Sequence, residues 1–182
     1  DKVLFCIFDF RYDIPYPTKM KITSKMSSTE PTQLSLSIKT KQKRNARSQF
    51  GALCYRVTDG KIQILLISSR RTKRWILPKG WPENGMTPGE SAANEAMEEA
   101  GVTGMLNERP LGVYCYEKNV ANGENYPCIV TIYALKVKKT WADYPEKSER
   151  RRKWFGRKGA AKRVFEPELA LLIKSFDPLQ GE

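Results

Sequence analysis

Three glutamates lie close together in one short stretch of this sequence. Glu95, Glu98 and Glu99 are spaced i, i+3 and i+4, so on a helix their carboxylates share one face. Like charges at these spacings repel, and a helix gains nothing from clustering them unless a cation lies between them. Magnesium is bound by a few carboxylates together with waters and substrate phosphate oxygens. The spacing therefore favours a site for a hard divalent ion, with a solvated acidic face as the alternative.

The residues around these glutamates carry the signals of a helix. Thr87 can act as the N-cap, Pro88 suits the first helical position, and Glu90 completes a capping box. Small apolar residues recur at helical spacing after them, and Gly101 provides a stop. These signals predict a helix from Pro88 to Ala100, which would hold the three carboxylates in a fixed arrangement.

The remaining elements are predicted to be strands and one further helix. An alternating stretch, the turn Thr58-Asp59-Gly60 and an apolar run together predict a β-hairpin. Two more β-rich stretches flank an Asn/Gly loop, and the C-terminal part has an apolar-faced helical pattern. The expected strands are 50–57, 62–67, 111–117 and 128–137, and the second helix is 167–176. Strands enclosed by two helices indicate an α/β fold, an α/β/α sandwich built on a mixed sheet.

The composition excludes several kinds of chemistry. The chain has 182 residues, enough for one domain with its own core, and it contains no histidine. That absence excludes a histidine base, a histidine metal ligand and a nucleophile activated by histidine. The four cysteines lack the paired spacings of zinc sites and redox dithiols. No apolar run approaches the roughly 20 residues of a membrane helix. We therefore expect a cytoplasmic protein without a membrane partner, in which carboxylates carry the catalysis.

The chain is strongly basic, with a formal net charge of +12. This excess favours an anionic partner, which could be a nucleic acid, a membrane surface or a small polyphosphate. Residues 18–48 are rich in Lys, Ser, Thr and Gln and end in a basic run at 39–47. Because such a composition supports no core, we expect residues 1–46 to be a disordered leader and a single domain to occupy residues 47–178.

The segment from Gly80 to Val102, GWPENGMTPGESAANEAMEEAGV, resembles the Nudix box. Met86 stands where the box has its first glutamate, and Asn94 stands where it has arginine. In the family these two side chains pair, so losing both removes an ion pair without stranding a charge. The resemblance implies a Nudix-type α/β/α sandwich with the Nudix strand-loop-helix, and cleavage of a phosphoanhydride bond. The matching positions are Gly80, Glu95, Ala96, Glu98, Glu99, Gly101 and Val102.

The resemblance also implies a role for individual residues. Glu95 and Glu99 would bind Mg²⁺ or Mn²⁺, with the backbone carbonyl of Lys79 as a candidate third ligand. Glu98 would be the general base that activates the attacking water. The metal would neutralise developing charge and lower the pKa of a bound water, so this chemistry needs no histidine.

The similarity extends beyond the box, over about residues 47–176. The stretches FGALCYR, LLISSRRTKRWILPKG and RRRKWF resemble the branch of diphosphoinositol polyphosphate phosphohydrolases and diadenosine polyphosphate hydrolases. Pro78-Lys79-Gly80 and Gln49 depart from the pattern of the inositol enzymes and favour a dinucleoside polyphosphate. The resemblance implies substrate phosphate contacts from Arg47, Ser69, Arg70, Arg74 and Arg152.

Three functions follow as alternatives. The first is a magnesium- or manganese-dependent phosphohydrolase whose partner is a small polyphosphorylated substrate, either a diphosphoinositol or a dinucleoside polyphosphate. The second is an RNA 5′-end pyrophosphohydrolase, in which the basic run at 39–47 would grip the RNA backbone. The third is a non-catalytic Nudix-fold module that binds a polyphosphate, which Met86 and Asn94 suggest. The sequence does not indicate an oligomeric state.

Overall fold

The computed structural model describes residues 33, 36, 45–119 and 125–178 of the chain. The leader expected over residues 1–46 lies outside these residues, apart from positions 33, 36, 45 and 46. Within the described part, no helix combines the length and the apolar character that crossing a membrane requires.

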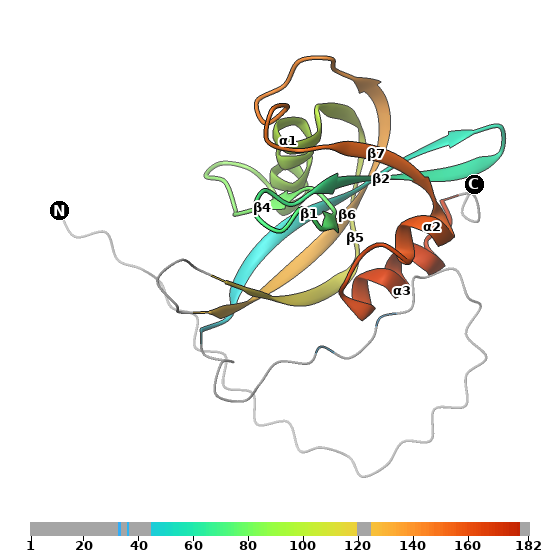
Figure 1. Ribbon diagram of the computed structural model, residues 1–182. Helices are drawn as coiled ribbons and strands as arrows, with labels where there is room; N and C mark the ends of the chain where they lie inside the picture. The colour runs from blue at the N-terminus through green and yellow to red at the C-terminus, as the bar shows by residue number, and fades with distance from the viewer. Residues whose placement is uncertain (1–32, 34–35, 37–44, 120–124, 179–182) are drawn as a thin grey trace, which may run out of the picture.

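A mixed β-sheet forms the centre of the described fold (Figure 1). Strands β3, β2, β1, β6 and β5 follow one another across it, while β4 pairs with β1 and β7 pairs with β2. Strands β1 and β6 run parallel, and the other pairs are antiparallel. The strands are β1 (Arg47–Thr58), β2 (Lys61–Ser68), β3 (Trp75–Ile76), β4 (Lys79–Gly80), β5 (Val102–Lys118), β6 (Tyr126–Thr140) and β7 (Arg152–Gly156). The predicted mixed sheet is confirmed.

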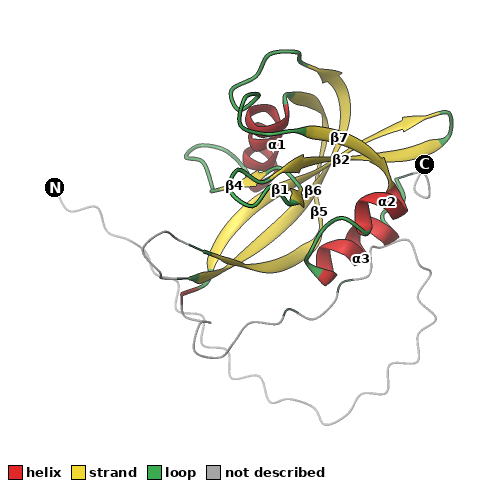
Figure 2. Cartoon of the chain, in the orientation of Figure 1, coloured by secondary structure: helices red, strands yellow, loops and turns green. Residues whose placement is uncertain are grey.

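Helices cover both faces of this sheet (Figure 2). In the described part they are α1 (Pro88–Ala100), α2 (Arg157–Ala161) and α3 (Pro167–Ser175). Side chains alternate between the two faces of a strand, so along β2 Leu65 and Ile67 share a core cluster with the alanines of α1. Ile64 and Leu66 instead share a cluster with residues of α2 and α3. The α/β/α sandwich is confirmed.

The strand boundaries differ from the prediction where the pattern is irregular. The predicted hairpin is confirmed, with Thr58 opposite Lys61. Strand β5 begins directly after α1, and its pairing with β6 has irregularities at Gly104 and Pro110. Bulges interrupt the alternation from which strands are predicted. The strands β3 and β4 have two residues each, too few to show an alternating pattern. They are recognised only from their pairing with neighbouring strands.

Helix α1 begins and ends as its sequence predicts. Thr87 Oγ1 accepts a hydrogen bond from the Glu90 backbone N–H at 3.1 Å, and the Thr87 N–H donates to Glu90 Oε2 at 2.7 Å. Gly101 ends the helix with φ of 60°, a left-handed conformation that glycine adopts readily. The helix that carries the glutamates is therefore fixed at both ends by local contacts.

Replacing Thr87 by alanine should lower the free energy of unfolding by about 1 kcal/mol, because the N-cap hydrogen bond is lost. Urea unfolding followed by circular dichroism measures this change. Thr87→Ser keeps a capping hydroxyl and should lose much less stability. Equal losses in the two variants would contradict a capping role for the Thr87 side chain.

Candidate active site

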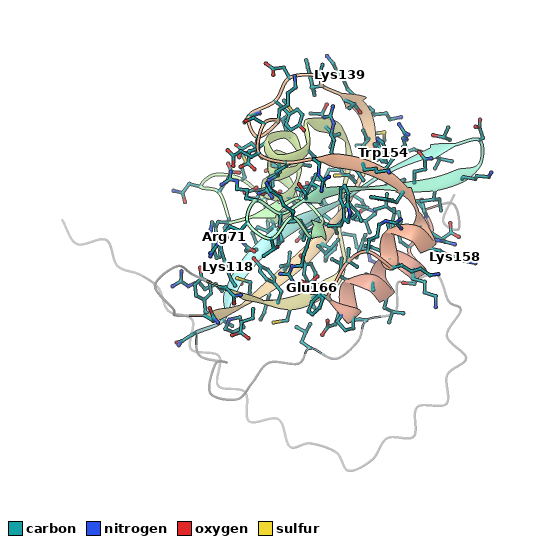
Figure 3. The ribbon with its side chains drawn as sticks, viewed as in Figure 1. Arg71, Lys118, Lys139, Trp154, Lys158 and Glu166 are labelled. Atoms are coloured by element: carbon teal, nitrogen blue, oxygen red, sulfur yellow. The ribbon has the colours of Figure 1, made fainter. Side chains whose placement is uncertain are left out.

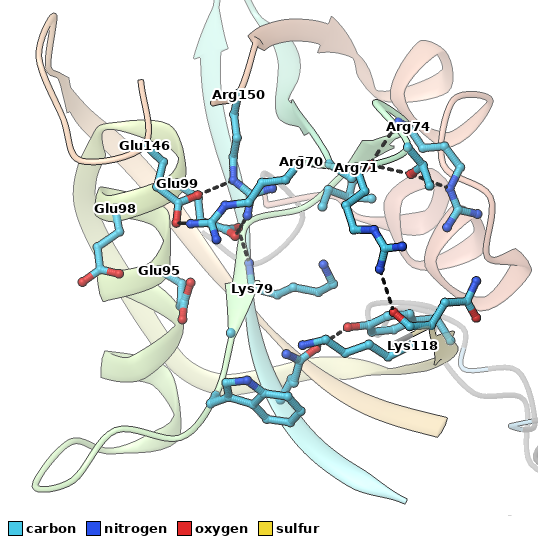
Figure 4. A pocket seen from close by; sticks show the side chains of 18 of the residues that line it. Arg70, Arg71, Arg74, Lys79, Glu95, Glu98, Glu99, Lys118, Glu146 and Arg150 are labelled. Carbon is cyan, nitrogen blue, oxygen red and sulfur yellow. Dashed lines mark hydrogen bonds and ion pairs between the residues drawn. The ribbon is translucent and has the colours of Figure 1, made fainter. Parts of the chain in front are cut away.

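The glutamate face of α1 borders a cavity of about 490 Å³ (Figure 4). Acidic side chains from α1, β5 and the segment after β6 line it: Glu95, Glu98, Glu99, Glu117 and Glu146. Basic side chains from the β2–β3 loop, β4, β5 and the segment before β7 line it as well: Arg70, Arg71, Arg74, Lys79, Lys118 and Arg150. Arg70 and Arg150 lie among the carboxylates, paired with Glu146 and Glu99. Figures 3 and 4 show Arg71 and Lys118 on the same side of the molecule. A cavity lined by both kinds of charge suits a cation together with a polyanion.

Gly80 allows the Glu95 carboxylate to approach the backbone of β4. Strand β4 pairs with β1, with Phe50 opposite Gly80. A Cβ atom at Gly80 would overlap the Glu95 carboxylate. Only glycine, which has no Cβ, leaves room for the carboxylate. The glycine at this position of the box therefore allows Glu95 to take its place in the site.

Glu99 is held by two partners inside the protein. The Lys79 backbone N–H donates to Glu99 Oε2 at 3.0 Å, and the Arg150 guanidinium forms an ion pair with Glu99 Oε1. Burial raises the pKa of Glu99, while Lys79 and Arg150 act in the opposite direction. Glu99 therefore has a cationic partner before any metal binds.

Sequence reasoning missed Arg150 and Glu146. Besides Glu99, Arg150 forms an ion pair with Glu146 and donates to the Ser68 carbonyl at 3.3 Å. Arg70 also pairs with Glu146, and it pairs with Glu149 at 2.6 Å. In the sequence, these residues belong to a charged run that has no periodic signal. Only the folded chain brings them to the cavity.

Asn94 connects the helix to the loop that precedes it. Its Nδ2 donates to Glu98 Oε1 at 3.1 Å and to Glu83 Oε1 at 2.7 Å. Met86, which stands at the position of the first box glutamate, is 43% exposed. Glu83 thus supplies a carboxylate partner for the residue at the box arginine position, and Asn94 orients Glu98.

Lys79 contributes a side chain as well as its backbone. Its ammonium lies 5.2 Å from the centroid of the Tyr116 ring, and the residue lines the cavity. Burial lowers the pKa of Lys79, and the Glu99 carboxylate opposes this effect. The sequence prediction considered only the Lys79 carbonyl.

Three of the five predicted substrate residues line the cavity: Ser69, Arg70 and Arg74. Ser69 Oγ lies 2.7 Å from Thr72 Oγ1 and accepts from the Arg74 N–H at 3.1 Å, which orders the β2–β3 loop. Arg74 also lies over the ring of Phe165, 5.2 Å from its centroid. These contacts therefore fix the backbone of the loop that carries Ser69 and Arg74.

The other two predicted substrate residues, Arg47 and Arg152, are not among the residues that line the cavity. Arg47 lies over the ring of Tyr126, 4.1 Å from its centroid. Arg152 donates to the carbonyls of Ala100 at 2.6 Å and Trp141 at 2.7 Å. A cation at the C-terminal end of a helix satisfies the last carbonyls and the dipole. The structure thus gives Arg152 a capping position at the end of α1, and its phosphate contact stays a prediction.

The carboxylates fit a divalent ion in their chemistry, although their present arrangement is not a complete metal site. Among the described residues, no group of three acidic or cysteine side chains is arranged to hold an ion. The reason is that Glu99 turns to Arg150 and Lys79. Burial, followed by the charges of Glu99 and Glu98, raises the pKa of Glu95 to about 7. A bound cation would oppose both the cost of burying the Glu95 charge and the repulsion from its neighbours.

Without divalent metal, the stability of the protein should fall between pH 4.5 and about 7 because of Glu95. In that range the unfolded chain releases this proton while the folded protein retains it, so rising pH favours unfolding. Thermal unfolding in a chelator should show wild type losing stability relative to Glu95→Gln across this range. Added magnesium should reduce the loss, since it favours the ionised carboxylate. Parallel pH profiles for the two proteins would contradict the raised pKa.

The sequence profile of the NUDIX domain matches residues 47–176. Nudix hydrolase 13, mitochondrial, of Arabidopsis thaliana is 39% identical over 107 residues, which cover 56% of this chain and 53% of that protein. Diphosphoinositol polyphosphate phosphohydrolase 2 of Rattus norvegicus is 32% identical over 117 residues, which cover 64% of this chain and 62% of that protein. The chain spans about half the length of the plant relatives it matches.

Solved structures show the same fold. The C. elegans Ap4A hydrolase binary complex superposes with a TM-score of 0.52 at 23% identity, covering 71% of this chain and 94% of that chain. At this identity the likeness concerns the arrangement of the sheet and helices.

Proposed function

The chain belongs to the Nudix family, and on this basis we propose that it is a divalent-metal-dependent hydrolase that cleaves a phosphoanhydride bond. The observation that carries the proposal is the cavity lined both by the carboxylates of α1 and by several arginine and lysine side chains. Such a site neutralises the phosphates of a substrate and places a base beside them.

In this mechanism Glu98 acts as the general base. Asn94 donates to one Glu98 oxygen at 3.1 Å, which leaves the other oxygen to accept the proton of the attacking water. Arg70, Arg71 and Lys79 hold phosphate oxygens and stabilise the charge that develops as the anhydride bond breaks. A positioned base of this kind contributes about 10²–10⁴ to the rate.

Glu95 and Glu99 would hold the metal, together with the Lys79 carbonyl. When bound, magnesium or manganese supplies charge neutralisation at the phosphoryl oxygens and a lower pKa for a bound water. To hold the metal, Glu99 would have to exchange its ion pair with Arg150 for the ion. The Glu95 carboxylate, by contrast, lies against the backbone of Gly80 at the edge of the cavity.

The contact between Asn94 and Glu83 supports catalysis over a module that only binds. The absence of the box arginine and first glutamate motivated the non-catalytic alternative. Because Asn94 bonds to both Glu83 and Glu98, the helix keeps a link to its preceding loop. Glu98 accordingly keeps an orienting partner.

The proposed substrates are diphosphoinositol polyphosphates or dinucleoside polyphosphates. Both carry several phosphates, and arginine side chains bind phosphate oxygens with two parallel hydrogen bonds. Diphosphoinositol polyphosphate phosphohydrolase 2 is one of the matched relatives. The RNA alternative depends on the basic run at 39–47, of which residues 39–44 lie outside the described residues; it stays a prediction.

A substrate panel tests the proposed function. Purified protein is incubated with a dinucleoside polyphosphate, a diphosphoinositol polyphosphate and 5′-triphosphorylated RNA, with magnesium or manganese, and products are separated by ion-exchange chromatography. We expect turnover of one of the first two and none in the presence of a chelator. Binding without turnover of any substrate would instead support the non-catalytic module.

For cellular location we propose the cytoplasm. The described cysteines Cys54, Cys115 and Cys128 are free thiols, which suits a reducing compartment. The plant relative named above carries a mitochondrial designation, so the alternative is a mitochondrial location. Immunoblotting of cytosolic and mitochondrial fractions separates the two.

A further inference from the structure

Strand β5 forms one edge of the described sheet. An edge strand presents backbone N–H and C=O groups that can pair with another chain, and proteins commonly cover or interrupt such edges. The irregularities in the pairing of β5 with β6 fall between Thr103 and Gly112, and charged side chains follow at Glu117 and Lys118. The stretch Val113–Tyr116 has neither protection, so it is the part of this edge most open to pairing.

The side chain of Gln33 occupies this stretch at Val113. Gln33 Nε2 donates to the Val113 carbonyl at 2.8 Å, and the Val113 N–H donates to Gln33 Oε1 at 2.7 Å. The carboxamide of glutamine carries the same kinds of donor and acceptor as a peptide group. Gln33 therefore pairs with Val113 as a residue of a neighbouring antiparallel strand would, with both hydrogen bonds exchanged.

Gly112 provides the room for this contact. A Cβ atom at Gly112 would lie 2.6 Å from Gln33 Oε1 and 2.7 Å from Leu172 Cδ2 on α3. The φ of Gly112 is 154°, a value that glycine adopts far more readily than other residues. The Gln33 amide thus lies in a space beside β5 and α3 that glycine leaves open.

The stretch of sequence around Gln33 has no core of its own. Residues 18–48 are rich in polar side chains, and such a composition supports no core. The partners that hold Gln33 therefore come from the domain. Leu36, three positions later, is half-buried.

We propose that the edge of β5 at Val113 is a docking site for the segment that carries Gln33 and Leu36, and that this segment keeps the edge from pairing with a second copy of the chain. Two hydrogen bonds hold the segment in place. They use the same backbone groups with which a second β5 would pair. This role does not depend on the proposed hydrolase function.

Hydrogen exchange followed by NMR tests the docking, with Cys115 as an internal reference. Every second residue of an antiparallel strand turns its N–H away from the partner strand, so Cys115 faces outward like Val113. Among the described residues, the outward Cys115 N–H has no hydrogen-bond partner. After correction for intrinsic rates, the Val113 amide of wild type should exchange about tenfold more slowly than that of Cys115. This difference should disappear in Gln33→Ala.

Two further variants identify the amide as the cause. Gln33→Glu replaces the donor by a carboxylate oxygen facing the Val113 carbonyl, so it should lose protection as Gln33→Ala does. Gln63→Ala is the matched control, because Gln63 lies on β2 and accepts from Arg56; it should leave Val113 unchanged. Slow Val113 exchange in Gln33→Ala would overturn the docking site. Wild-type protection that falls on dilution would also overturn it, since Gln33 would then come from a second copy.

Sedimentation velocity tests whether the docked segment shields the edge. At the same high protein concentration, Gln33→Ala should have a larger weight-average mass than wild type. Its Val113 and Cys115 amides should then become protected again, because two β5 edges pair. Equal masses of the two proteins at every concentration would overturn the shielding of the edge by Gln33.

Discussion

Replacing Glu98 by glutamine should lower kcat by about 10²–10⁴-fold, because the amide cannot accept the proton of the attacking water. The fold should be unaffected, since Glu98 is only partly buried. Its contact with Asn94 uses Oε1 as an acceptor at 3.1 Å, and glutamine retains such an oxygen. Steady-state kinetics with saturating magnesium and the best substrate of the panel measure the loss, and thermal unfolding checks the fold.

A matched charge change shows whether the effect of Glu98→Gln is local. Asp143→Asn also removes one carboxylate, but its side chain is 96% exposed and does not line the cavity. Its kcat should equal that of wild type. If Glu98→Gln loses less than about tenfold in kcat, or if Asp143→Asn loses as much, Glu98 is not the general base.

Replacing Arg150 by alanine should lower the free energy of unfolding by about 3–5 kcal/mol, because it leaves the Glu99 carboxylate buried without its cation. The two side chains are 8% and 7% exposed, so water cannot replace the lost partner. Arg150 also pairs with Glu146, whose charge would lose a partner as well. Urea unfolding in a chelator measures the change.

Two further variants identify the stranded charge as the cause. The double variant Arg150→Ala/Glu99→Gln should recover part of the lost stability, since no ionised Glu99 remains. Arg151→Ala removes the neighbouring exposed cation, which contacts the face of Trp75 at 5.9 Å, and should change stability by no more than about 0.5 kcal/mol. Wild-type stability in Arg150→Ala would show that Glu99 does not depend on this ion pair.

The features that the sequence predicted correctly depend on residues near one another in the chain. The capping box of α1, its stop at Gly101 and the shared face of the three glutamates follow from spacings of three or four residues. The hairpin of β1 and β2 depends on one turn between two apolar runs. Strand β5 was underestimated because its bulges interrupt the alternation.

The environment of each carboxylate depends instead on contacts between distant segments. Glu99 and Arg150 are 51 positions apart, and Arg70 and Glu146 are 76 apart. Nothing in the charged run at 146–151 distinguishes the arginine that reaches the cavity from its exposed neighbour. The contact of Asn94 with Glu83 likewise depends on how the loop before α1 folds back.

Residue type and local spacing alone determined the acidic helix and the hairpin, and the resemblance of the segment Gly80 to Val102 to the Nudix box indicated the family. The tertiary structure decided which charges meet: it placed Arg152 at the end of α1 and brought Arg150 to Glu99. The physical reason is that a helix or turn is set by the hydrogen bonds of neighbouring residues. The partner of a charged side chain, by contrast, is set by how the layers of the sandwich pack.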